Sequence, residues 1–162
     1  MEELKTIPPE NRVYMDESGV DDTLHRQYGR AKRGVEVPGE ISGRRTNRIS
    51  IIAAFNQNKL IAPLRFEGYC DTELVNVWAK ECLSPCLKAG QVVICDNASF
   101  HKASRMKEIV ESKGARLLPL PTYSPDLNPI EQYWGISKAR IRKYRHPEQP
   151  LTDILDEVLC MT

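Results

Sequence analysis

The sequence predicts an α/β fold, because segments typical of strands alternate with segments typical of amphipathic helices along its 162 residues. Hydrophobic residues make up 41% of the chain, which supplies the core of one domain and leaves little room for two. No internal repeat and no low-complexity segment interrupts the alternation. We therefore expect a single domain from residue 1 to residue 162.

Strands are expected first near the amino terminus. The apolar segment 12–15 (RVYM) runs into Asp16, and the segment 47–66 contains two more apolar strands with the polar turn 56–59 between them. The segment 28–34 (YGRAKRG) is interpreted as a further short strand. Because consecutive strands joined by short turns usually pair with each other, we expect these early strands to form a meander.

A helix is expected after the meander. Asp71 or Thr72 can cap its amino terminus, and its apolar residues recur on one face. Pro85 breaks or restarts this helix, since proline cannot donate the next hydrogen bond. Gly90 is a suitable residue to end it.

A buried strand and a crossover helix follow. The segment 91–96 (QVVICD) is apolar up to its last residue and does not alternate, which indicates a strand buried on both faces at the sheet centre. The apolar residues of segment 103–110 lie on one helical face, Gly114 closes that helix, and the segment 116–120 (RLLPL) is the next strand.

The formal net charge is only +1, but charges of like sign cluster along the chain. One basic cluster lies within residues 25–48, and a second occupies residues 137–146 (SKARIRKYRH). Such clusters are common on solvated surfaces, yet two of them flanking acidic candidates also fit a polyanion partner. The basic residues assigned to this partner are Arg44, Arg45, Arg48, Lys138, Arg140, Arg142 and Lys143.

Several classes of protein are excluded by simple patterns. No stretch approaches the roughly 18 apolar residues of a membrane span, and the acidic amino terminus lacks the pattern of a signal peptide. We therefore expect a cytoplasmic protein without a membrane partner. The five cysteines include no CxxC pair, so neither a disulfide framework nor a zinc site is expected.

Three acids are candidates for chemistry. Asp96 follows the buried strand and Asp16 ends the apolar segment before it, and the carboxyl ends of strands in open α/β sheets are where ligands bind. Glu131 falls in the first turn of a helix that begins at Asn128 and Pro129. Each acid also has a purely structural interpretation: an aspartate after a strand is often a cap, and the pair Asn128 and Glu131 has capping-box spacing.

The words CDNASFH (95–101) and LPTYSPDLNPIEQYW (120–134) resemble the catalytic domain of mariner-type and related bacterial insertion-sequence transposases, the DDE class. Between Asp96 and Glu131 lie 34 residues, the spacing between the second and third catalytic acids of that class. The upstream word MDESG (15–19) is similar to the strand that carries the first acid. The resemblance extends from about residue 13 to residue 143.

This resemblance implies an RNase-H-like fold, with a central mixed five-stranded sheet and helices on both faces. It implies a catalytic, metal-binding triad of Asp16, Asp96 and Glu131, with Asn97, His101 and Asn128 in supporting roles. Phosphodiester cleavage independently favours such a triad, because two Mg²⁺ ions on carboxylate oxygens generate the nucleophile and neutralise charge at the phosphate. Asp16 is expected to bridge the ions, and Mn²⁺ can substitute for Mg²⁺. DNA is the implied substrate and a homodimer the implied assembly.

One departure from the family concerns the amino terminus. Transposases of this class carry a helix-turn-helix region that recognises the transposon ends, whereas only fifteen residues precede Asp16. We therefore interpret the chain as a fragment, or as the second product of a split gene, with a separate or upstream helix-turn-helix region. Two alternatives remain open: a catalytically idle remnant that binds DNA or dimerises, and a host RNase-H-like nuclease.

Overall fold

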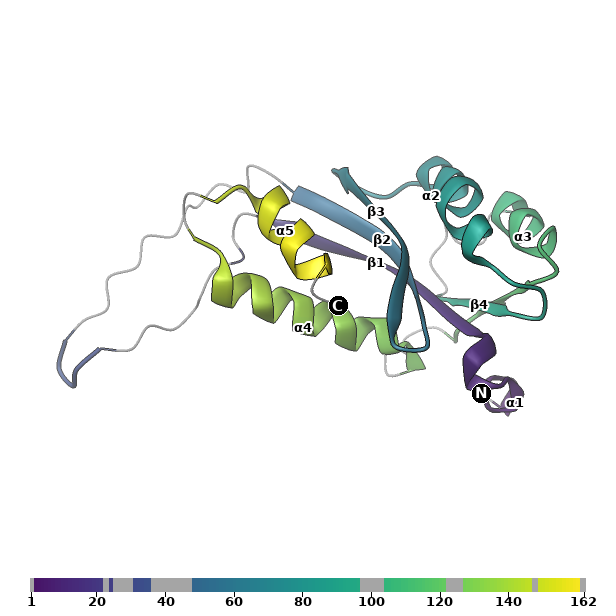
Figure 1. The fold of residues 1–162 in the computed structure, drawn as a ribbon, viewed down its shortest axis with the longest axis horizontal. Helices are drawn as coiled ribbons and strands as arrows, with labels where there is room; N and C mark the ends of the chain where they lie inside the picture. Colours follow the sequence, from purple (N-terminus) through teal and green to yellow (C-terminus); the bar gives the residue numbers. More distant parts are fainter. Residues whose placement is uncertain are drawn as a thin grey trace.

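The computed structural model of the protein describes residues 2–21, 24, 31–35, 48–96, 104–121, 127–146 and 149–160. Five strands form one mixed sheet in the order β3-β2-β1-β4-β5 (Figure 1). They are β1 (Arg12–Asp21), β2 (Arg48–Asn56), β3 (Lys59–Glu67), β4 (Val92–Cys95) and β5 (Arg116–Pro119). Strand β1 is central, because it pairs antiparallel with β2 on one side and parallel with β4 on the other. This arrangement confirms the predicted mixed five-stranded sheet.

Helices cover both faces of this sheet, as predicted. Figure 1 shows α2 and α3 on one face and α4 and α5 on the other. The helical segments are α1 (Glu2–Thr6), the 3-10 turn η1 (Pro9–Asn11), α2 (Thr72–Trp78), the π-helix η2 (Ala79–Leu83), the 3-10 turn η3 (Ser84–Cys86), α3 (Ser104–Glu111), α4 (Pro129–Tyr144) and α5 (Leu151–Cys160). Within the part of the chain that the structure describes, no helix is both long enough and apolar enough to cross a membrane.

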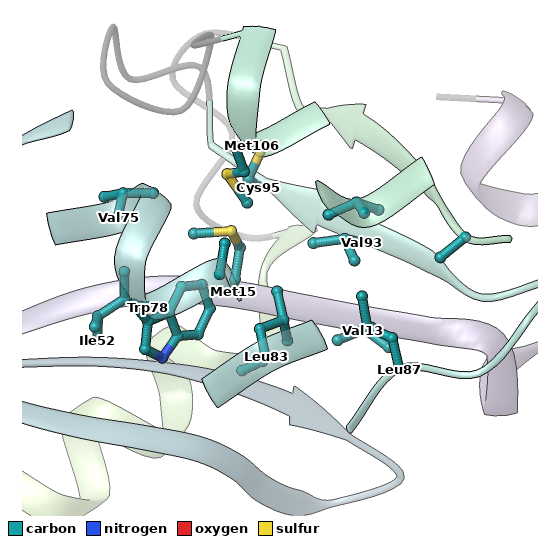
Figure 2. Close-up of a cluster of buried hydrophobic side chains, with 14 residues drawn as sticks. Val13, Met15, Ile52, Val75, Trp78, Leu83, Leu87, Val93, Cys95 and Met106 are labelled. Carbon is teal, nitrogen blue, oxygen red and sulfur yellow. The ribbon is translucent and has the colours of Figure 1, made fainter. Parts of the chain in front are cut away.

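The hydrophobic core is divided by the sheet because successive residues of a strand point to opposite faces. Val13 and Met15 of β1 pack with Trp78 and Leu83 in the cluster under α2, η2 and α3 (Figure 2). The opposite face of β1 carries Tyr14, Asp16, Ser18 and Val20, which are all buried. Asp16 therefore points to the face that α4 and α5 cover.

The second cluster packs α4 and α5 onto that opposite face. Ile51 and Ala53 of β2 contact apolar residues of both helices, among them Trp134, Ile141 and Leu155. Ring centroids of Tyr133 and Trp134 lie 5.5 Å apart in an edge-to-face arrangement. Because Trp134 and Ile141 are at most 3% exposed, α4 is held to β1 and β2 along two turns of its length.

A β-bulge interrupts the edge strand β3. The register between β2 and β3 shifts between Ile52 and Ala54, and Ala62 opposite them has a φ of 51°. The Ala62 carbonyl accepts a hydrogen bond of 2.7 Å from the Trp78 indole N–H, and the next residue, Pro63, cannot donate to a ladder. Bulges and prolines on an edge strand oppose pairing with a strand of another chain, so β3 is protected against edge-to-edge association.

Several elements agree with the sequence predictions. Strands β1, β2 and β3 form the expected meander, and the predicted turn 56–59 joins the last two. Gln57 and Asn58 both have positive φ, as a two-residue hairpin turn requires. Asp71 caps α2 through a bond of 2.8 Å from the Leu74 amide to its carboxylate.

Other elements differ from the predictions. The structure describes residues 31–35, which overlap the end of the strand predicted at 28–34. These residues form a turn at Gly34, in which the Val35 amide donates a hydrogen bond to the Lys32 carbonyl. Strand β1 continues to Asp21, so Asp16 lies inside the strand and does not end it, because β2 pairs with β1 over this whole length. Helices α1 and α5 have no counterpart among the elements that the sequence predicts.

Candidate active site

Strands β1 and β4 bring Asp16 and Asp96 to the same level of the sheet. Their parallel pairing ends at Tyr14 and Ile94, because β4 is only four residues long. Asp16 and Asp96 each lie two residues beyond this last pair. Asp16 is still within β1, whereas Asp96 directly follows the end of β4. In open α/β sheets ligands bind beside the carboxyl ends of parallel strands, so this edge of β1 and β4 is named the crevice below. Asp16 is 8% exposed, whereas Asp96 lies on the surface.

Helix α4 brings Glu131 to this crevice. The amino-terminal part of α4 is tied to β1 on both sides of Glu131: the Asn128 side-chain amide donates to the Met15 carbonyl at 3.4 Å, and the Trp134 indole N–H donates to Asp16 Oδ2 at 3.1 Å. Glu131 itself is exposed. The Asn128 side chain makes no capping hydrogen bond, so the structure contradicts the capping-box interpretation.

The electrostatic state of Asp16 shows that the three acids influence one another. Burial raises the pKa of Asp16, and the negative charges of Glu131 and Asp96 raise it further. Hydrogen bonds from the Glu17 amide and the Trp134 indole act in the opposite direction, and the resulting pKa is about 7. A buried carboxylate beside two others is a position where a cation would be bound favourably.

The donor set fits a hard divalent cation, since three carboxylates from three separate elements can supply oxygen ligands. A further buried oxygen, Asn128 Oδ1, has no hydrogen-bond partner in the described part of the protein. Among the described residues, however, no three His, Cys, Asp or Glu side chains stand close enough together to enclose a metal ion.

Glu17, the acid that follows Asp16 in the sequence, points away from this crevice. It follows Asp16 in β1 and therefore faces the other side of the sheet, where the Cys70 thiol donates a hydrogen bond to it. Burial and this neighbouring carboxylate raise the pKa of Cys70 to about 12, so its thiol stays protonated. Glu17 thus belongs to a structural contact on the face of α2.

The basic candidates fall into two groups. Lys138, Arg140, Arg142 and Lys143 occupy the second half of α4, the helix that begins beside the acids. Arg48 lies elsewhere: its guanidinium packs against Gly19, with Nε 3.4 Å from Ser50 Oγ and its carbon 4.8 Å from the centre of the Tyr69 ring. The structure therefore does not bring Arg48 together with Asp16. Arg44, Arg45, Asn97 and His101 lie outside the described residues.

Most of the sequence matches a known protein family. The family described as DDE superfamily endonuclease matches residues 11–151. The chain belongs to this family. The match spans Asp16, Asp96 and Glu131, so the crevice described above lies within the DDE endonuclease domain.

Individual relatives share parts of this domain. The transposable element Tc3 transposase of Caenorhabditis elegans is 46% identical over 41 residues, which are 25% of this chain and 12% of that protein. The Mos1 mariner paired-end complex with Mn has a similar structure, with a TM-score of 0.72 and 16% identity over 99% of this chain and 51% of that chain. The catalytic domain of Mos1 mariner transposase aligns over 99% of this chain and 75% of its own, with a TM-score of 0.61 and 14% identity.

The structural similarities confirm the predicted RNase-H-like fold. They also show that the chain spans about half the length of the longer Mos1 chain. The DDE domain contains one contact that sequence reasoning missed, namely the bond from Trp134 to Asp16. The available signal was the helical spacing of Glu131 and Trp134, which are three residues apart and hence neighbours on one face of α4.

Proposed function

We propose that this DDE domain cleaves a DNA strand and transfers a 3′-hydroxyl to target DNA, with Asp16, Asp96 and Glu131 as its metal ligands. One observation carries the proposal: the buried carboxylate of Asp16 lies within the electrostatic influence of both other acids, although β1, the residue after β4 and helix α4 supply the three acids separately. Nothing in the packing of the core requires three like charges at one crevice, and like charges oppose folding.

The proposed metals are two Mg²⁺ ions, for which Mn²⁺ can substitute. When bound, the pair would activate the attacking oxygen and neutralise charge on the phosphate. Asp16, at the centre of the sheet, would contact both ions, and Asp96 and Glu131 would each complete one site. The similar Mos1 structure, a paired-end complex with Mn, supports this choice of metal.

The proposed partner is DNA, bound by the basic second half of α4. A separate or upstream helix-turn-helix region would then supply recognition of transposon ends, and two copies of the chain would act together. The similar Mos1 structure is a paired-end complex, which supports the proposal that two copies act together.

Strand cleavage can be tested with the 162-residue chain itself. We expect it to nick supercoiled plasmid DNA in Mn²⁺ and, more slowly, in Mg²⁺, but not in EDTA. The Asp96→Asn variant should bind the plasmid as well as the parent and nick it at less than about one-hundredth of the rate, because a missing ligand disrupts a metal site. A parent chain that binds plasmid in Mn²⁺ without nicking it would favour the catalytically idle remnant.

DNA binding should fall steeply with salt, because phosphate contacts release counterions. Replacing Arg142 and Lys143 with glutamine should lower the slope of log K against log salt by about 1 for each phosphate contact removed. The control exchanges Lys80 and Lys107, which lie on the other face of the sheet and pair with neighbouring glutamates. Fluorescence anisotropy with a labelled duplex measures both slopes. If the slope of log K against log salt decreased equally in both double variants, α4 would not be the DNA-binding surface.

A further inference from the structure

The buried indole of Trp134 is hydrogen-bonded to a carboxylate. Its side chain is 3% exposed, and its N–H donates to a carboxylate of the candidate site, Asp16 Oδ2. The other tryptophan of the chain, Trp78, is also buried, but its N–H donates to the backbone carbonyl of Ala62. Both indoles fill a core, and only Trp134 fixes an acid.

The position of Trp134 on α4 couples this bond to Glu131. Residues three apart lie on the same face of a helix, so Glu131 and Trp134 move together when α4 shifts along the sheet. Asp16 also accepts a hydrogen bond from the Glu17 amide, within its own strand. The indole N–H is thus the link that relates the orientation of Asp16 to the helix that carries Glu131.

We propose that Trp134 is a positioning residue of the metal site. Its N–H holds one oxygen of the Asp16 carboxylate, fixes the rotation of that group, and sets its distance from Glu131 before any metal binds. Such outer contacts orient metal ligands and strengthen binding, because the metal need not order the ligands itself. This inference rests on the proposed function, since it assumes that Asp16 is a ligand.

A purely structural role would predict something different. The ring of Trp134 packs against apolar residues of β2 and α5, and a phenylalanine ring could preserve much of that packing. Loss of the N–H alone would then lower stability without any particular effect on metal affinity. The two roles therefore separate when metal binding and stability are measured on the same variants.

The first experiment uses the unmodified chain. It contains two tryptophans, so a proton–nitrogen spectrum shows two indole N–H signals, which Trp78→Phe assigns. We expect added Mg²⁺ to shift the Trp134 signal in a saturable manner and to leave the Trp78 signal in place. If calorimetry detects Mg²⁺ binding that Asp96→Asn removes, and the Trp134 signal does not move, the positioning role is wrong.

The second experiment compares Trp134→Phe with Trp78→Phe, two exchanges that each remove one indole N–H from a buried site. Mn²⁺ affinity, measured by electron paramagnetic resonance, should fall about tenfold in Trp134→Phe, the effect typical of a lost outer contact. It should change less than about twofold in Trp78→Phe, while both variants melt at lower temperature. Equal Mn²⁺ affinities would overturn the inference. A parent chain that binds no Mn²⁺ would overturn the proposed function as well.

Discussion

Replacing Glu131 with glutamine is expected to reduce metal-dependent nicking by more than about 100-fold while changing the free energy of unfolding by less than about 1 kcal/mol. Glu131 is exposed in the first turn of α4, so the exchange leaves no cavity. Its charge favours the helix amino terminus and opposes the nearby Asp16, and these two effects partly cancel. The amide of glutamine, in contrast, is a poor substitute for a carboxylate ligand of a divalent cation.

The matched control for Glu131 is Glu108→Gln on α3, another exposed glutamate, on the other face of the sheet. This variant should nick supercoiled plasmid at the parental rate. Urea unfolding of the parent and both variants measures stability. Full nicking activity in Glu131→Gln would remove Glu131 from the triad, and a large loss of stability would favour a structural role in α4.

Replacing Asp16 with asparagine is expected to stabilise the metal-free protein at pH 8 by about 1–3 kcal/mol and to abolish nicking. The pKa of Asp16 is raised from 3.8 to about 7, foremost by burial, and a shift of this size is on the order of 4 kcal/mol. Asparagine removes the buried charge and retains an oxygen that can accept the Trp134 bond. The gain is smaller than the full shift because its amide hydrogens also need partners.

The stability gain of Asp16→Asn should depend on pH, because protonation of Asp16 is thermodynamically linked to folding. Because the pKa of Asp16 is higher in the folded chain than in the unfolded chain, the folded chain binds more protons between about pH 4 and pH 7. The carboxyl therefore contributes stability that is fully present below about pH 4 and is lost as the pH rises through about 7. The advantage of the asparagine variant should accordingly be greatest at pH 8 and small at pH 4.5.

Urea unfolding in EDTA at pH 4.5, 6 and 8 measures this pattern for Asp16→Asn. The control is Asp153→Asn on α5, an exchange at an exposed aspartate that removes no buried charge. Added Mn²⁺ should stabilise the parent at pH 8 and not the Asp16 variant, because a ligand that binds only the folded state stabilises it. An asparagine variant that is less stable than the parent at pH 8 would show that the Asp16 charge holds the fold together.

Local rules were sufficient for most elements of this protein. The uninterrupted apolar run before Asp96 indicated β4, and the polar residues 56–59 indicated the hairpin turn where Gln57 and Asn58 have positive φ. The pair Asn128 and Pro129 marked the start of α4. These predictions succeeded because they depend on neighbours in the chain. The expected strand at 28–34 failed in its described part, where no pairing partner is present and Gly34 favours a turn.

The sequence by itself therefore determined the RNase-H-like class, the family and the identity of the three candidate acids, because short sequence motifs and the spacing between them indicate each of these. Tertiary structure decided their environment. Asp16 became a buried, interior residue of β1 because β2 pairs with it along the whole strand, and its bond to Trp134 joins residues 118 positions apart. Such a contact depends on how α4 crosses the sheet. That crossing results from the summed burial of both faces of the core, which no local pattern encodes.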